Sequence, residues 1–175
     1  DTALERLQIF ERRAALEANA ANRRAVLEEA ARLATGLGEH DRAVAAWEKR
    51  LTLDQQDGEA LDALVALFGA TKRPDALVAS LRRRLELPRG DALARADLEQ
   101  IARVQVEELG TPAAAIETWL ELVRRFGEDR AAVASLRTLL AGAARWDELG
   151  ALLTRVSERE RGHLGVALFE PGHVD

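Results

Sequence analysis

The chain has 175 residues, of which 47% are hydrophobic and 31% charged, and its formal net charge is -5. This balance fits a folded chain rather than a disordered one. The acidic excess disfavours a general phosphate-binding role, because non-specific affinity for nucleic acid depends on clustered Lys and Arg. The absence of cysteine excludes disulfides, Cys-ligated zinc and thiol catalysis. No apolar run approaches the roughly 20 residues that a membrane-spanning helix needs.

The pattern of apolar residues predicts helices throughout the chain. Ala and Leu supply most of the apolar side chains, and the β-branched and aromatic runs typical of sheet are scarce. Apolar residues recur at spacings of three and four, which place them on one helical stripe. We expect nine helices, which cover about 2–18, 20–36, 39–54, 57–71, 74–87, 91–109, 112–126, 129–143 and 145–160.

The boundaries between these segments carry their own chemical signals. Pro74 and Pro112 stand in the first turn of a helix, where the missing amide hydrogen is tolerated. Asp57, Asp91 and Asp129 can accept the free amide hydrogens at a helix start. These signals place the helix starts at the positions that the apolar pattern indicates.

Four segments align when the chain is shifted by one helix pair. The equivalent turn residues are Gly38, Lys72, Gly110 and Ala144, so the offsets are 34, 38 and 34 residues. A period in the thirties with two amphipathic runs per unit indicates a stack of helix pairs. We expect a single array over 1–161, followed by a tail or truncated next repeat over 162–175. The longer offset predicts a first helix about one turn longer in the third unit.

The stretch 24–55 resembles a tetratricopeptide repeat (TPR). The matching features are the glycine–acid turn Gly38-Glu39, the small Ala43, the aromatic Trp47 and the closing Leu-x-Leu-Asp at 51–54. The repeat from Gly110 keeps the alanine and the tryptophan as Ala115 and Trp119, whereas the second and fourth units carry leucine at both positions. The resemblance covers about 20–160 and implies a right-handed α-solenoid of stacked antiparallel hairpins.

The resemblance also implies where partners would bind, since the first helix of each TPR pair lines a concave groove. We expect the polar residues of those helices to form a protein- or peptide-binding groove. These residues are Glu28, Glu29, Arg32, Glu59, Asp62, Asp97, Gln100, Glu107, Glu108, Ser135 and Thr138. The set is mostly acidic, which favours a basic or helical peptide through charge steering. The alternative is that these side chains are only the solvated faces of amphipathic helices.

Other motifs that could carry chemistry have simpler interpretations. His40 lies in a turn and is expected to pack between helices, and a metal site at His163 and His173 would need convergence within the tail. Arg82-Arg83-Arg84 with Arg89 could form a basic spot, although a solvated outer face is favoured. Trp47, Trp119 and Trp146 could stack on a ligand, but we expect them to act as wedges between hairpins. We expect no catalytic residue, no metal and no cofactor.

The sequence thus predicts an all-α, TPR-like array that acts as a non-enzymatic scaffold for protein or peptide partners. One alternative is a regulatory or sensor array joined to an effector domain outside this segment, and another is an enzyme on a helical scaffold. We expect neither nucleic acid nor a membrane span among its associations, whereas a homodimer through exposed solenoid ends is plausible. The chain opens without Met and is expected to be a piece of a longer bacterial protein, with a cytoplasmic location favoured.

Overall fold

The computed structural model describes residues 2–167 of the chain. Within that range all nine predicted helices are present and no strand occurs, which confirms the all-α class. The helices are α1 Ala3–Leu16, α2 Ala20–Gly36, α3 His40–Leu53, α4 Gly58–Ala70, α5 Pro74–Arg84, α6 Asp91–Glu107, α7 Pro112–Phe126, α8 Arg130–Gly142 and α9 Trp146–Ala167.

Two helix ends differ from the prediction. Helix α5 ends at Arg84, three residues early, because Pro88 disfavours helical backbone just before it and the chain tightens into turns that begin at Leu85. Helix α9 continues to Ala167, so the first residues of the predicted tail are helical. The rest of that tail, 168–175, lies outside the described residues.

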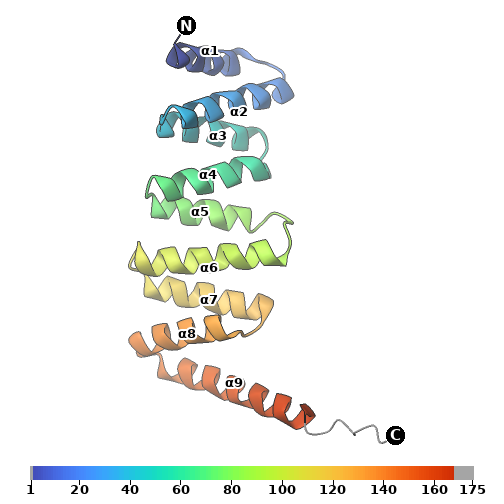
Figure 1. Cartoon of the computed structure of the whole chain (residues 1–175), viewed down its shortest axis with the longest axis vertical. Helices are drawn as coiled ribbons and strands as arrows, with labels where there is room; N and C mark the ends of the chain where they lie inside the picture. Colours follow the sequence, from blue (N-terminus) through green and yellow to red (C-terminus); the bar gives the residue numbers. More distant parts are fainter. Residues whose placement is uncertain (1, 168–175) are drawn as a thin grey trace, which may run out of the picture. The chain divides into compact units, whose positions relative to one another are not determined.

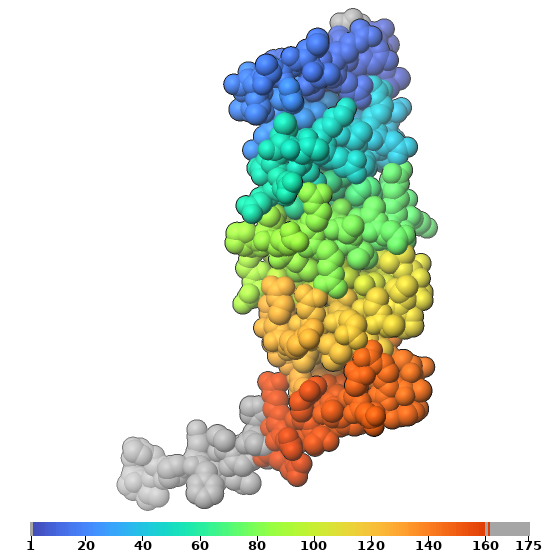
Figure 2. Space-filling model, turned by 180° about the vertical axis from the view of Figure 1, so that it is seen from behind, coloured from blue at the N-terminus to red at the C-terminus, as the bar shows by residue number. Residues whose placement is uncertain are grey.

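The chain divides into two compact units, Asp1–Asp97 and Leu98–Asp175, and the division falls inside α6. In the first unit α2 packs against α1 and α3, while α4 packs against α3 and α5. In the second unit α8 packs against α7 and α9. Successive helices within a unit run in opposite directions (Figure 1), and their side chains close against one another (Figure 2). Each unit is therefore a stack of antiparallel helices.

The four predicted turn stations share one backbone conformation. The φ angles are positive at Gly38 (75°), Lys72 (53°), Gly110 (61°) and Ala144 (54°). After three of these turns an amide donates to a carbonyl five residues earlier: Glu39 to Ala34 at 2.9 Å, Arg73 to Phe68 at 3.0 Å and Arg145 to Leu140 at 2.9 Å. These bonds satisfy carbonyls at the helix end. The third turn is wider, since the amide of Thr111 reaches Gln105 at 2.7 Å.

The predicted helix starts are largely confirmed. The carboxylates of Asp57 and Asp129 accept the amides of Ala60 and Ala132, at 3.1 Å and 2.8 Å. Pro74 and Pro112 are the first residues of α5 and α7. Asp91 differs, because it is itself the first residue of α6. Helix α6 has 17 residues against 13 in α4 and α8, but α2 also has 17, so the extra turn is not particular to the third unit.

The tryptophans do not share one role. Trp47 is buried, and Trp119 packs half-buried against the core cluster of the second unit, in which Ile116, Leu136 and Leu140 are fully buried. Trp146 is 62% exposed, so its predicted role as a wedge is wrong. It is the first residue of α9, and a helical side chain leans toward the N-terminus. Its ring therefore extends past the helix end, where no earlier turn of α9 can cover it.

Candidate functional site

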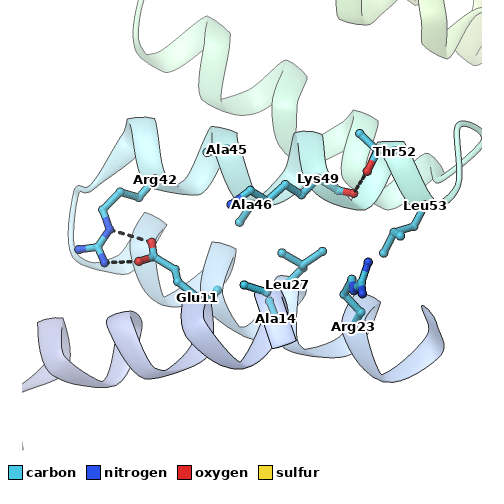
Figure 3. A pocket seen from close by; sticks show the side chains of 12 residues that line it. Glu11, Ala14, Arg23, Leu27, Arg42, Ala45, Ala46, Lys49, Thr52 and Leu53 are labelled. Atoms are coloured by element: carbon cyan, nitrogen blue, oxygen red, sulfur yellow. Dashed lines mark hydrogen bonds and ion pairs between the residues drawn. The ribbon is translucent and has the colours of Figure 1, made fainter. Parts of the chain in front are cut away.

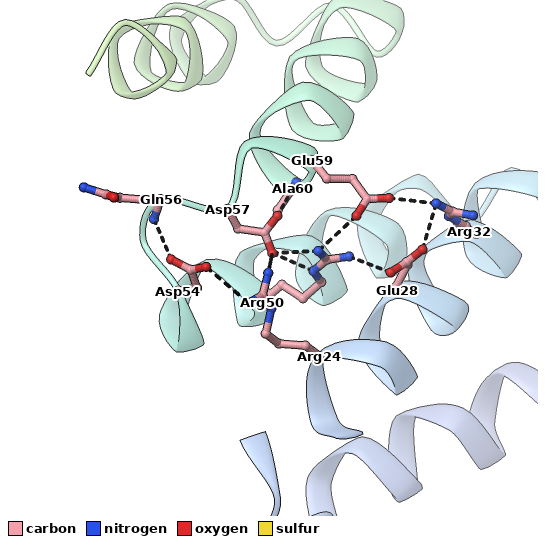
Figure 4. A network of polar contacts seen from close by, with 9 residues as sticks. All are labelled: Arg24, Glu28, Arg32, Arg50, Asp54, Gln56, Asp57, Glu59 and Ala60. Atoms are coloured by element: carbon pink, nitrogen blue, oxygen red, sulfur yellow. Dashed lines mark hydrogen bonds and ion pairs between the residues drawn. The ribbon is translucent and has the colours of Figure 1, made fainter. Parts of the chain in front are cut away.

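A buried guanidinium lies at the centre of the first unit. Arg50, near the end of α3, is 4% exposed. Its Nε donates to Asp57 at 2.8 Å, its Nη1 to Glu28 at 3.0 Å and its Nη2 to Glu59 at 3.1 Å (Figure 4). The guanidinium carbon also lies 5.0 Å from the ring centroid of Trp47. One side chain thereby connects α2, α3 and the start of α4 through charge-assisted hydrogen bonds.

Asp57 serves this network and the helix start together. One carboxylate oxygen caps α4, and the other accepts from Arg50 and from Arg24, the latter at 3.0 Å. Burial raises the pKa of Asp57, but the amide of Ala60 and the guanidinium of Arg50 outweigh it and hold the pKa below its ordinary value. The carboxylate therefore stays ionised although its side chain is only 3% exposed.

The outer part of the network contains three of the predicted groove residues. Arg32 pairs with Glu28 and Glu59, both at 2.7 Å (Figure 4). The hydrogen bond from Arg32 lowers the pKa of Glu59, and the bond from Arg50 adds to this effect. Two arginines therefore offset the charge that Glu28 and Glu59 were expected to present to a partner.

A second arginine network occurs one repeat later. Arg84, near the end of α5, donates to Asp62 at 2.8 Å and also pairs with Asp97, which is buried. Arg89 pairs with Asp62 as well. Burial raises the pKa of Asp62, but the bonds from Arg89 and Arg84 leave it below its ordinary value. Arg84 and Arg89 thus belong to an internal network, and the expected solvated face or basic spot at these two residues is wrong.

The sequence carries a signal for both networks in the spacing of its charged residues. Arg84 follows Arg50 by the same 34 residues that separate Asp62 from Glu28. Charges of opposite sign that recur together with the repeat indicate a recurring ion pair. Among the predicted acidic residues of α2 and α4, Glu29 is exposed and makes no ion pair with a described residue, while the others are paired.

The second unit presents an open hollow between its two parallel first helices. This hollow, of 570 Å³, is lined from α6 by Ala102, Val106 and Glu107, from α8 by Ala131, Ala134 and Thr138, and by Trp119 of α7. It brings together three predicted groove residues: Glu107, Ser135 and Thr138. Gln100 is half-buried and Glu108 exposed, and neither lines it. Trp119, Val106 and Arg103 also line it, although the sequence pattern did not predict them as groove residues.

The acidic side chains that line this hollow are Glu99 and Glu107, both on α6, and Glu108 lies beside it. Glu107 is the last residue of α6, Glu108 follows it, and both are exposed. Neither makes an ion pair with any residue in the described range. Two carboxylates at the C-terminal end of a helix are unfavourable, because this end of the helix dipole is also negative. A cationic group placed there would be stabilised by both side chains and by the dipole.

A smaller hollow lies in the first unit and is lined by residues of α1, α2 and α3 (Figure 3). It encloses 220 Å³ and is lined by small residues such as Ala14 and Ala46. An ion pair between Arg42 and Glu11, with bonds of 2.9 Å and 2.7 Å, closes one end. The hydrogen bond from Arg42 lowers the pKa of Glu11. The polar groups at this end are thus already matched to one another.

The described residues show no cluster of metal ligands. Within the described range no three His, Asp or Glu side chains converge as a metal site would require. His40 is exposed as the first residue of α3, so its expected packing between helices is wrong. The side chains of His163 and His173 lie outside the described residues. No described helix combines the length and apolarity that a membrane crossing requires.

Comparison with known proteins places the fold. No protein-family model matches the chain, and no curated protein matches it. Two solved structures of MamA align with this chain, each with a TM-score of 0.51. One is 19% identical, and the alignment covers 89% of this chain and 81% of that structure's chain. The other is 16% identical, and the alignment covers 91% of this chain and 89% of that structure's chain. The structure titled "YrrB: a TPR protein with an unusual peptide-binding site" has a TM-score of 0.48 at 20% identity, covering 79% and 69%. The chain has a TPR-like helical-repeat fold.

Proposed function

We propose that this chain is a non-enzymatic peptide-binding module and that its peptide site is the hollow between α6 and α8. The observation that carries the proposal is the tryptophan ring in a hollow walled by alanines. Trp119 is half-buried, and Ala102, Ala131 and Ala134 leave room above it for another side chain. Aromatic side chains that remain partly exposed in a concave surface are the usual anchors of protein recognition.

The side chains around this ring indicate what kind of peptide would fit. Val106 is 38% exposed and, with Leu139, extends the apolar surface. An amphipathic peptide could bury an apolar side chain over Trp119. Glu107 lines the site at the end of α6, and the exposed Glu108 follows it just outside the lining, so a Lys or Arg of the peptide at that end would be stabilised. The proposed partner is therefore a basic or helical peptide whose basic residue lies at the end of α6.

Binding, rather than group transfer, is the activity that this lining supports. The hollow is open, and its lining contains neither histidine nor cysteine. Its hydroxyls are Ser135 and Thr138, and the hydroxyl of Thr138 already donates to the carbonyl of Ala134 at 3.1 Å. Small apolar groups with a few flanking charges suit a ligand that is held and released. The module therefore acts through its partner. We also propose that it is located in the cytoplasm.

A matched pair of substitutions tests the site. Peptides selected from a displayed random library against the native chain would be measured again with Ala131→Arg and with Ala113→Arg. Both alanines are exposed on helices, but only Ala131 lines the hollow. We expect Ala131→Arg to weaken binding at least about tenfold, which is roughly 1.4 kcal/mol, and Ala113→Arg to leave it unchanged. If both variants bound the peptides equally well, the peptide site would not be the hollow between α6 and α8.

Charge reversal in the first unit would be a poorer test of the groove. Glu59 and Asp62 hold Arg50 and Arg84 through ion pairs. Lysine at either position would break these pairs and lower the stability of the unit whether or not a peptide binds there. The exposed alanines of α8 avoid this ambiguity.

A further inference from the structure

We propose that a second surface, formed by α8 and α9, binds an acidic peptide segment. It lies on the side of α8 that faces α9, so it is distinct from the hollow between α6 and α8. Its hollow of 710 Å³ is lined by Arg130, Arg137 and Arg159 around Val133 and Val156, and the remaining lining residues are Glu128, Asp129 and Ala134. We call the three arginines and the two valines the arginine surface. Only Ala134 lines both hollows.

The two arginines of α8 present their charge to solvent. Arg130 and Arg137 are exposed, and neither makes an ion pair or side-chain hydrogen bond with any described residue. They are seven residues apart, which is about two helical turns, so both project from one face of α8. Arg159 of α9 is exposed too, and its Nη1 donates to the carbonyl of Glu128 at 2.7 Å.

The acids nearest to these arginines already have partners. Glu128 has a side chain only 14% exposed, and it pairs with Arg155 at 3.1 Å. Asp129 uses a carboxylate oxygen to cap α8 through the amide of Ala132. Both acids are thus engaged at the helix start while the arginines point outward. The surface is cationic even though the whole chain has a formal net charge of -5.

The position of Arg130 works against the stability of its own helix. It is the first residue of α8, where the helix dipole is positive and an acidic residue would be favoured. The first turns of α1, α3, α4, α5, α6 and α9 carry Asp or Glu instead. The capping carboxylate of Asp129 offsets the positive end of the helix, and the exposed guanidinium of Arg130 adds a positive charge beside it that an anionic ligand can reach.

The composition of the surface favours a peptide over a small anion. Val133 and Val156 are half-buried between the arginines and offer apolar contact. Guanidinium groups match carboxylates in a bidentate geometry. A segment that alternates Glu or Asp with an apolar residue could satisfy both kinds of group at the same time.

The test uses a fluorescent peptide of alternating glutamate and leucine with an amidated end, and its glutamine–leucine counterpart. We expect the native chain to bind the glutamate peptide at least tenfold more tightly. Arg130→Gln with Arg137→Gln should weaken that binding by about tenfold for each arginine removed. The control, Arg6→Gln with Arg12→Gln, changes the net charge equally at exposed positions of α1 and should bind like the native chain.

Three outcomes would overturn the proposal. The glutamine peptide could bind as tightly as the glutamate peptide, the control variant could weaken binding as much as the α8 variant, or an oligonucleotide of equal charge could compete as well as unlabelled peptide. The last result would show general polyanion attraction. Unchanged affinity of a library-selected peptide for the α8 variant would leave the site at Trp119 intact, so the two proposals fail separately.

Discussion

The two units of the chain fill equivalent positions with opposite chemistry. The residue twelve places after the turn is Arg50 or Arg84 in the first unit and Leu122 or Val156 in the second. Ten places before the turn the same repeats carry Glu28, Asp62, Gln100 and Ala134. The buried charged residues Arg50, Asp57 and Asp97 all lie in the first unit, whereas the buried polar residues of the second are the neutral Gln105 and Thr118, bonded at 2.8 Å.

This difference shows that the repeat fixes a geometric position and not the chemistry used there. A buried guanidinium is tolerated only where carboxylates surround it, because the cost of removing a charge from water is several kcal/mol. In the first unit those carboxylates come from two neighbouring helices and a helix cap. In the second unit Leu122 needs no partner. At this repeat position the first unit therefore uses charge pairing and the second uses apolar packing.

The largest expected effect comes from moving the charge of the first unit into the second. Leu122→Arg should lower the free energy of unfolding by about 4 kcal/mol or more, because Leu122 is fully buried and Gln100 cannot neutralise a guanidinium. Adding Gln100→Glu, which recreates the spacing of Glu28 and Arg50, should return part of that loss. Urea unfolding followed by tryptophan fluorescence measures both. If Leu122→Arg alone were as stable as the native chain, the proposed difference between the two units at this position would be wrong.

The reverse change removes the charge from the first unit. Arg50→Ala should cost about 3 kcal/mol, because Asp57 is left buried with weaker compensation from Arg24. The matched control is Arg32→Ala, whose side chain is 65% exposed and which should leave unfolding unchanged. If the two variants unfold alike, the burial of Arg50 has no energetic importance.

At low pH the first unit should lose stability before the second. The pKa values of Glu11, Asp57, Glu59 and Asp62 are all lowered, and all four residues lie in the first unit. A carboxyl with a lowered folded pKa contributes stability above its unfolded pKa, near 4, and loses it as the pH falls through the folded pKa. Below about pH 4 the first unit should therefore lose protection earlier than the second.

Amide hydrogen exchange measured unit by unit, at neutral pH and then at successively lower pH, would show this order. Added salt should weaken the exposed pairs of the network more than the buried pair of Arg50 and Asp57. Simultaneous loss of protection in both units, or earlier loss in the second, would be inconsistent with the charge-dependent stability of the first.

The smallest expected effects concern the turns, where the two units agree. Ala144→Gly and Lys72→Gly should each raise the free energy of unfolding by about 0.5–1 kcal/mol, because glycine adopts positive φ without strain. Gly38→Ala should lower it by about 1 kcal/mol for the same reason. Thermal unfolding of the three variants measures these changes, and a gain at only one of Lys72 and Ala144 would show that the turns are not equivalent.

Much of the candidate site was beyond sequence reasoning. The pattern identified Glu107, Ser135 and Thr138 as residues of the first helices, and the structure places all three in one hollow. It did not reveal that Trp119 reaches the same hollow from α7, because helical periodicity does not distinguish a fully buried ring from one at the edge of the core. Nor did it show that Glu28 and Glu59 form ion pairs with Arg50. The sequence pattern of a charged helical residue is the same whether the residue contacts water or a residue of another helix.

The amino-acid sequence by itself determined the helices, their caps and the four equivalent turns. These features depend on local physics: the spacing of apolar residues, proline at a helix start, and the left-handed turn that follows each first helix. Tertiary structure alone decided which charges are buried and which surfaces stay open. Those outcomes depend on distances between residues some thirty positions apart, as Arg24 and Asp57 illustrate. Such distances follow from how helices pack, which no local pattern encodes.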